Sequence, residues 1–282
     1  MARRQRPPRH VPQVSASSTM QDRSPLPSFD LDGRLAVITG ASRGIGAALA
    51  RGFRQAGARV VLAARSTDRL DALANETGII GETVFSVGTD VTRSEDIERL
   101  ADIVAGIARP NEQLVLVNNA GFGFTKPALE TTQDDWDALF DTSARATFLV
   151  SRALAPMMIE RRYGKIMNLS STWSQSTESG KAIYSAAKAA VSRLTSALST
   201  EWAPMGVRVN ALAPTATLTE FTADVMRKNP QRAERMRERI RLGRFAETSD
   251  LLGPAIFLAS AASDFVTGQT LFVDGGWNGA SC

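Results

Sequence analysis

The fold of this chain is decided by the segment Leu35-Ala36-Val37-Ile38-Thr39-Gly40-Ala41-Ser42-Arg43-Gly44-Ile45-Gly46. It begins with a short apolar run rich in β-branched side chains, which predicts a buried strand over residues 34–39. The glycines that follow, Gly40, Gly44 and Gly46, allow a tight turn and bring main-chain N–H groups close to a ligand. They also open a helix, whose N-terminus favours an anion. The segment therefore predicts a strand, a phosphate-binding turn and a helix in direct succession.

Outward from this segment, short apolar runs alternate with longer helical patterns, which is typical of repeated strand–helix–strand units and a parallel sheet. The expected strands are 34–39, 59–63, 83–87, 114–118, 165–169, 208–212 and 270–273. The expected helices lie near 43–56, 94–108, 134–161, 183–203, 220–239 and 248–260. We therefore predict one α/β domain over residues 29–282, a Rossmann-type doubly wound fold with a seven-stranded parallel sheet and helices on both faces.

The composition excludes several kinds of chemistry. The only cysteine of the 282 residues is Cys282 and the only histidine is His10. Intramolecular disulfides, thiolate zinc sites and Ser-His-Asp or Cys-His catalysis are therefore excluded, and no metal is expected. No apolar run reaches the roughly 20 residues of a membrane-spanning helix, and no secretory signal pattern is present. We expect a cytoplasmic protein that does not bind membranes.

The formal charge of +4 lies in the N-terminal segment 1–28. Its charged residues are Arg3, Arg4, Arg6, Arg9 and Arg23 against Asp22, so the rest of the chain is neutral. The segment is rich in Arg, Pro and Ser and lacks apolar periodicity, which predicts disorder. The alternatives are a basic arm for nucleic acid or membrane, a targeting peptide, or a true start at Met20. Because the domain itself is neutral, nucleic-acid binding is not expected.

The charges near the glycine turn discriminate between two dinucleotides. NAD leaves a ribose 2′-OH that suits a carboxylate, whereas NADP carries a 2′-phosphate that suits arginine. The second expected strand runs into Ala64 and Arg65 without an acidic residue, and Arg43 lies inside the glycine turn. The sequence therefore favours NADP(H) over NAD(H). The alternative is that both arginines are solvated loop residues.

Tyr184 and Lys188 lie one helical turn apart in a strongly helical stretch, so they share a helix face. A tyrosine with its usual pKa of about 10 is a poor acid and base at neutral pH, and we expect a neighbouring ammonium to lower that pKa. Ser171 follows the expected strand 165–169 at the edge where α/β sheets bind ligands, and its hydroxyl can hydrogen-bond a substrate oxygen. Each feature is unremarkable alone, but together with the glycine turn they predict an acid/base, Tyr184, assisted by Lys188 and Ser171.

In the order of these motifs the chain resembles the classical short-chain dehydrogenase/reductase family over about residues 31–278. The resemblance implies an oxidoreductase that acts on a CH–OH group, in which Tyr184 protonates the carbonyl oxygen during reduction, Ser171 steadies it and Lys188 also binds the nicotinamide ribose. The positions expected to bind the cofactor are Gly40, Ser42, Arg43, Gly44, Ile45, Gly46, Arg65, Asp90, Val91, Asn118, Ala120, Gly121, Tyr184, Lys188, Pro214, Thr217 and Thr219.

Three positions depart from the family pattern, and one of them, Leu114 in place of an acidic residue, is expected to be structurally mild. The other two are Ser143 and Thr215. Ser143 stands where an asparagine usually completes a catalytic tetrad and anchors a relay water, and we expect the shorter serine to need a water to take that part. Thr215 replaces the usual glycine after Pro214, and threonine adopts a positive φ at greater cost. Both departures keep open a second hypothesis, a non-catalytic dinucleotide-binding sensor or scaffold on the same fold.

We expect the substrate pocket to be lined by residues 122–124, by Trp173, Gln175 and Ser176, and by residues 219–241 acting as a mobile lid. The arginines of this lid favour an acidic substrate, but they suit a solvated helix face equally well. In overall pattern the chain is similar to the gluconate 5-dehydrogenase and 3-oxoacyl-carrier-protein reductase branches of the family. That similarity implies a small polar or acyl carbonyl compound, or its alcohol.

The expected helices 134–161 and 183–203 are long and rich in Ala, Leu, Met and Val. Part of their apolar surface needs a cover, and in the resembling family such helices pair across a two-fold axis. We therefore predict a homo-oligomer, specifically a homotetramer, with residues 272–277 as a second contact. The alternative is a monomer in which both helices simply face the sheet.

Overall fold

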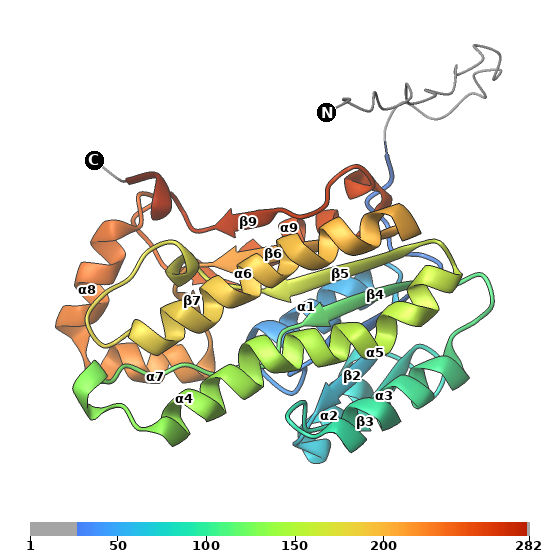
Figure 1. Cartoon of the computed structure of the whole chain (residues 1–282), viewed down its shortest axis with the longest axis horizontal. Helices are drawn as coiled ribbons and strands as arrows, with labels where there is room; N and C mark the ends of the chain where they lie inside the picture. Colours follow the sequence, from blue (N-terminus) through green and yellow to red (C-terminus); the bar gives the residue numbers. More distant parts are fainter. Residues whose placement is uncertain (1–26, 281–282) are drawn as a thin grey trace, which may run out of the picture.

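The computed structural model of the protein describes residues 27–280, so residues 1–26 of the segment predicted to be disordered lie outside the described residues. A seven-stranded parallel sheet, in the order β3-β2-β1-β4-β5-β6-β9, forms the centre of the molecule (Figure 1). Its strands are β1 (Arg34–Thr39), β2 (Arg59–Ala64), β3 (Val84–Gly88), β4 (Gln113–Asn118), β5 (Gly164–Leu169), β6 (Val207–Pro214) and β9 (Thr270–Val273). A separate short parallel pair consists of β7 (Thr217–Leu218) and β8 (Ala246–Glu247). The predicted fold class is confirmed.

Helices cover both faces of the sheet (Figure 1). They are α1 (Gly44–Gln55), α2 (Thr67–Thr77), α3 (Ser94–Ile107), α4 (Gln133–Phe140), α5 (Ala146–Glu160), α6 (Ala182–Trp202), α7 (Glu220–Lys228), α8 (Pro230–Arg239) and α9 (Leu252–Ala259). No helix within residues 27–280 is both long and apolar enough to cross a membrane.

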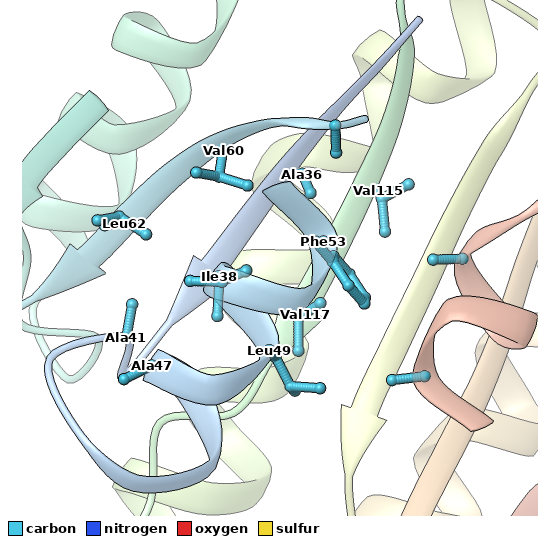
Figure 2. Close-up of a cluster of buried hydrophobic side chains, with 14 of the residues drawn as sticks. Ala36, Ile38, Ala41, Ala47, Leu49, Phe53, Val60, Leu62, Val115 and Val117 are labelled. Atoms are coloured by element: carbon cyan, nitrogen blue, oxygen red, sulfur yellow. The ribbon is translucent and has the colours of Figure 1, made fainter. Parts of the chain in front are cut away.

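Alternation along the buried strands divides the core into two layers. In β1, Ala36 and Ile38 point to one face, where they pack with residues of α1, α2 and α9. Leu35 and Val37 point to the other face, against α3, α5 and α6. Figure 2 shows the first layer, with Phe53 of α1 lying over the strands. Because successive side chains of a strand point to opposite faces, a strand buried on both sides must be apolar throughout, as this one is.

Three helical boundaries differ from the sequence prediction. The predicted helix 134–161 is divided into α4 and α5 by a π-helical turn, Asp141–Arg145. The predicted helix 220–239 is two helices, because Pro230 cannot continue a helix and holds Asn229 outside the helical region, at φ −138° and ψ 74°. In the segment 248–260, α9 begins only at Leu252, after the 3₁₀ turn Thr248–Leu251.

Helix α2 was not predicted at all. Its buried residues are Leu70, Leu73 and Ala74, and the remaining positions are polar apart from the exposed Ala72. This apolar stripe is much narrower than the stripe of a typical core-facing helix, and therefore gives a weak periodic signal.

The order of the strands determines where the site lies. β1 pairs with β2 on one side and with β4 on the other. The strands β2 and β3 therefore extend the sheet on one side of β1 and the strands from β4 onward extend it on the other, so the strand order reverses between β1 and β4. Ligands of doubly wound sheets bind beyond the carboxyl ends of the strands at such a reversal. Figure 1 shows α7 and α8 beyond the arrowheads of the central strands, at this same end.

Candidate active site

A cavity of about 1000 Å³ opens at the carboxyl ends of the strands. Its walls come from the loops after β1 to β6 and from residues of α6, α7 and α8. Every residue that the sequence assigned to the cofactor or to catalysis lines this cavity, except Gly46, Asn118 and Ser143. Within residues 27–280, no group of three or more His, Cys, Asp or Glu side chains could hold a metal ion.

The glycine turn at one end of the cavity has the backbone that its sequence predicts. Gly40 and Gly44 have φ values of +64° and +57°, which few residues other than glycine adopt at low cost. Gly46 lies behind the turn: a Cβ atom on it would stand 2.4 Å from both the Nδ2 atom of Asn119 and the carbonyl oxygen of Gly40. Gly46 therefore shapes the turn from within and does not line the cavity.

The two neighbouring asparagines after β4 have different surroundings. Asn118 is buried, and its Nδ2 donates hydrogen bonds of 2.9 Å to Ser151 Oγ and to Asn168 Oδ1. Its side chain belongs to a polar network inside the molecule, so our expectation that it would face the cofactor is wrong for the side chain. Asn119, which we did not select, lines the cavity and donates from Nδ2 to the carbonyl oxygens of Thr39 and Gly40.

Three arginines gather where the cavity extends beyond β2. Arg43 and Arg65, selected from the sequence, line this end with exposed side chains, and Arg69 of α2 joins them. Burial alone would raise the pKa of Asp90, but hydrogen bonds from Thr92 and the charge of Arg65 bring it below its ordinary value. Arg69 was missed because α2 was missed. The cluster is suited to a phosphate group, since guanidinium groups pair well with phosphate oxygens.

Ser171, Tyr184 and Lys188 meet at the opposite end of the cavity. Ser171 directly follows β5, and its Oγ accepts a hydrogen bond of 3.2 Å from the main chain of Trp173. Lys188 is buried on α6, and its Nζ donates a 2.7 Å hydrogen bond to the carbonyl oxygen of Leu169. The same Nζ lies 6.0 Å from the centre of the Tyr184 ring. The predicted residues are thus brought together.

The pKa of Tyr184 does not shift in the direction that we expected. Burial of the phenol raises its pKa, and a hydrogen bond with Ser171 offsets this only in part. Burial also lowers the pKa of Lys188 to about 8. The net shift of the tyrosine pKa is therefore upward and not downward as we expected, because desolvation of the buried phenol is its largest cause. In the protein without bound ligands, the phenol of Tyr184 therefore carries its proton at neutral pH.

Ser143 and Thr215, the two departures that keep the sensor hypothesis open, have different structural outcomes. Ser143 lies in the π-helical turn before α5, where it is 1% exposed, and its Oγ has no hydrogen-bond partner among the described residues. Thr215 lines the cavity without strain, since Arg162 is the only non-glycine residue of the described chain with a positive φ. The cost that we expected for Thr215 does not arise.

Aromatic residues close the cavity beyond Ser171. Trp173 is buried edge-to-face against Trp277, with ring centres 5.2 Å apart. The indole N–H of Trp277 donates a 3.0 Å hydrogen bond to Ser176 Oγ. The central carbon of the Arg239 guanidinium lies 4.1 Å from the centre of the Trp277 ring. The C-terminal segment therefore supports the loop that carries Ser171.

Residues of the segment 219–241, in α7 and α8, line this end of the cavity, where the sequence predicts the substrate pocket. Several of its cations are engaged by carboxylates: Arg227 and Lys228 by Asp224, and Arg237 by Glu234. Arg232 lines the cavity and pairs with Glu178. Sequence reasoning also missed a further cation of the cavity, Lys181, because a lysine in a loop before a helix gives no signal of burial.

The chain is similar in sequence to known proteins. A sequence model of the family described as enoyl-(acyl carrier protein) reductase matches residues 40–278. A gluconate 5-dehydrogenase of Gluconobacter oxydans (strain 621H) is 39% identical over 249 residues, which cover 88% of this chain and 96% of that protein. A 2-dehydro-3-deoxy-D-gluconate 5-dehydrogenase of Escherichia coli (strain K12) is 35% identical over 253 residues, which cover 89% of this chain and 98% of that protein.

Among solved structures, a gluconate 5-dehydrogenase from Burkholderia cenocepacia J2315, in complex with NADP and tartrate, superposes with a TM-score of 0.82 at 37% identity. The match covers 90% of this chain and 98% of that one.

The close packing behind the glycine turn gives a first prediction. Gly46→Ala should lower the affinity for NADPH at least about tenfold, because the added methyl group displaces the turn from Asn119 and moves its N–H groups away from a phosphate. Titration of the protein by NADPH fluorescence measures this. Gly106→Ala is the matched control, since a Cβ there meets nothing within 4 Å. Equal NADPH affinity in both variants would contradict the assignment of the turn.

Proposed function

The chain belongs to the short-chain dehydrogenase/reductase family, and on that premise we propose that it uses NADP(H) to interconvert a carbonyl and a secondary alcohol in a small polyhydroxylated carboxylic acid. The proposal rests on how the residues of one cavity are arranged. An arginine-lined glycine turn forms one end, and Ser171, Tyr184 and Lys188 meet at the other. The sensor hypothesis is not supported, because the relatives are dehydrogenases and the acid/base set is complete.

The residues of the cavity fit a dinucleotide. The cradle formed by Gly40 and Gly44 leaves main-chain N–H groups accessible at the start of α1, while Arg43, Arg65 and Arg69 suit a 2′-phosphate. When bound, NADPH supplies the hydride. Residues of this chain bind the substrate, orient it and transfer the proton.

The proton of the reaction belongs to Tyr184 in this proposal. In the direction of reduction, its phenol donates a proton to the carbonyl oxygen of the substrate, and Ser171 donates a hydrogen bond to the same oxygen. Lys188, held by Leu169, stabilises the phenolate that remains. The phenol of Tyr184 is protonated at neutral pH, so it carries the proton that the reduction consumes.

Ser143 acts at one remove. It lies behind the cavity wall with an unpartnered hydroxyl, on a turn that packs against α6. We propose that Ser143 binds a water molecule, and that this water helps to return a proton to Tyr184. A buried hydroxyl without a protein partner is the kind of group that ordered water satisfies.

The substrate class rests on the relatives. The Gluconobacter and Escherichia proteins are named for sugar acids, and the Burkholderia structure holds tartrate, a hydroxylated dicarboxylate. This favours the gluconate dehydrogenase branch over the 3-oxoacyl-carrier-protein reductase branch for our chain. The proposed substrate is a sugar acid or its keto form.

The role of Tyr184 can be tested with a matched tyrosine. Tyr184→Phe should lower the turnover number with 5-keto-D-gluconate about 10²- to 10⁴-fold, because the proton donor is removed, while affinity for NADPH stays within about twofold. The measurement is NADPH absorbance. The control is Tyr163→Phe, at the only other tyrosine of the chain. Tyr163 directly precedes β5, at the amino ends of the strands and away from the cavity, and its hydroxyl donates a hydrogen bond to Asp264. Full turnover in the Tyr184 variant would refute the mechanism.

The preference for NADP(H) rests on the arginine cluster. Arg65→Ala should weaken NADPH binding about tenfold or more, and the double variant with Arg43→Ala further, while NADH affinity changes by less than about twofold. Fluorescence titration with both nucleotides measures this. Arg51→Ala is the control, since Arg51 pairs with Glu76 outside the cavity. If both nucleotides lose affinity equally, the 2′-phosphate assignment is wrong.

We also propose that the chain assembles as a homotetramer. Trp136 of α4 and Phe148 of α5 are 46% and 39% exposed, and the Trp136 ring stacks on Phe140 with centres 4.5 Å apart. Exposed aromatic side chains on α4 and α5 are apolar surface of the kind that isologous interfaces cover. Trp277, from the second expected contact, is buried within its own chain, which leaves less of that segment for a partner.

Light scattering at micromolar concentration tests the assembly. The expected mass is four times the chain mass of 30.3 kDa. Phe148→Glu should lower that mass, because it places a charge in the proposed contact. A wild-type mass near 30.3 kDa would refute the prediction.

A further inference from the structure

Lys181 occupies the wall of the cavity beside the catalytic tyrosine. It directly precedes α6 and lies three residues before Tyr184. Its Nζ lies 5.2 Å from the centre of the Tyr184 ring, which is nearer than the 6.0 Å of Lys188. The catalytic phenol is therefore flanked by two ammonium groups, of which the mechanism uses only one.

The surroundings of Lys181 hold its ammonium at the cavity. Its Nζ donates a 2.9 Å hydrogen bond to the carbonyl oxygen of Phe124, in the loop after β4. The same loop is tied to the residue before Lys181, because Lys126 donates its main-chain N–H to Gly180 over 3.0 Å. Both contacts join the start of α6 to the loop that covers Tyr184. Lysine side chains on a surface extend into solvent, whereas this one is turned back against the protein.

The charges around Lys181 are not balanced by the protein. The nearby carboxylate, Glu178, is engaged by Arg232 of α8. Among the described residues Lys181 makes no ion pair, and its hydrogen-bond partner is one carbonyl oxygen, although an ammonium has three donors. Burial and the charge of Arg232 lower its pKa to about 8, and Glu178 offsets this in part. A partly buried cation of this kind is costly to keep unless an anion compensates it.

We propose that Lys181 binds the carboxylate of the substrate and so determines that the enzyme prefers a sugar acid to the corresponding neutral sugar or polyol. This assignment rests on the proposed function. Lys181 lies one helical turn before Tyr184, so the substrate carboxylate would bind on the same wall of the cavity as the substrate carbonyl oxygen but at a distance from it. One end of the substrate is thereby fixed by charge while the other meets Tyr184 and Ser171.

A competing role for Lys181 predicts a different pattern. If the second ammonium acted only on the phenol of Tyr184, its loss would change the turnover number equally for acidic and neutral substrates. If it binds a carboxylate, its loss should raise KM for the acid alone. A pair of probes that differ only at the far end separates the two. 5-Keto-D-gluconate and L-sorbose share the same carbon chain and ketone, and the first has a carboxylate where the second has a hydroxymethyl group.

The experiment measures KM and kcat for both ketones with saturating NADPH. Lys181→Met should raise KM for 5-keto-D-gluconate at least about tenfold and leave L-sorbose within about twofold. Lys181→Arg should retain most of the discrimination, because it keeps the charge. Lys228→Met is the matched control, an exposed lysine of α7 that pairs with Asp224 and does not line the cavity. Equal changes for both ketones, or none, would overturn the assignment.

A binding measurement separates this assignment from the proposed activity. Calorimetric titration of the NADP⁺ complex with D-gluconate and D-glucitol should show that wild type binds the acid more tightly and that Lys181→Met loses this difference. That result without any turnover would refute the proposed reaction and leave Lys181 as a carboxylate-binding residue. Turnover of L-sorbose by a wild type that binds no carboxylate would confirm carbonyl reduction and overturn the role of Lys181. NADP⁺ binding by the variant verifies that it is folded.

Discussion

Thr39 joins the carboxyl ends of β1 and β4, and the rest of the site depends on this junction. Its Oγ1 accepts main-chain hydrogen bonds from Asn119 and Ala120 over 3.0 and 3.1 Å, and donates to the carbonyl oxygen of Val117. The two strands are neighbours at the point where the strand order reverses. The glycine turn after β1 and the loop after β4 are therefore held as two sides of one crevice, and both the turn and the wall beside Tyr184 start from fixed ends.

The sequence was most informative where local chemistry and packing demand the same residue. A strand buried on both faces must be apolar throughout, and the glycine turn can be formed by few other residues, so β1 and its turn could be predicted. The choice between Asn118 and Asn119 could not. Adjacent residues at the end of a strand face different surroundings, and only the register and the neighbouring chain decide which one enters the core. Helix α2 was missed because its buried apolar stripe around Leu70 and Leu73 is too narrow to give a clear helical period in the sequence.

Burial explains the other differences between expectation and structure. The sequence shows that Tyr184 and Lys188 share a helix face, but it does not show how much water each loses, and desolvation sets the direction of both pKa shifts. Lys181 was overlooked for the same reason, since its character comes from the loop that packs over it. The break before Pro230 was visible in the sequence, because proline disfavours helix in the residue before it, but the apolar periodicity on both sides suggested one helix.

The contact between Trp173 and Trp277 joins residues that a ribosome synthesises far apart in time. Ser171, Tyr184 and Lys188 are all translated long before Trp277, whose indole N–H supports the loop of the catalytic serine through Ser176. Strand β9, which closes the edge of the sheet beside β6, is also added late. A nascent chain that already carries Ser171, Tyr184 and Lys188 thus lacks the tryptophan that packs against Trp173. The proposed site is consequently complete only near the end of translation, once residues 270–277 have joined the core.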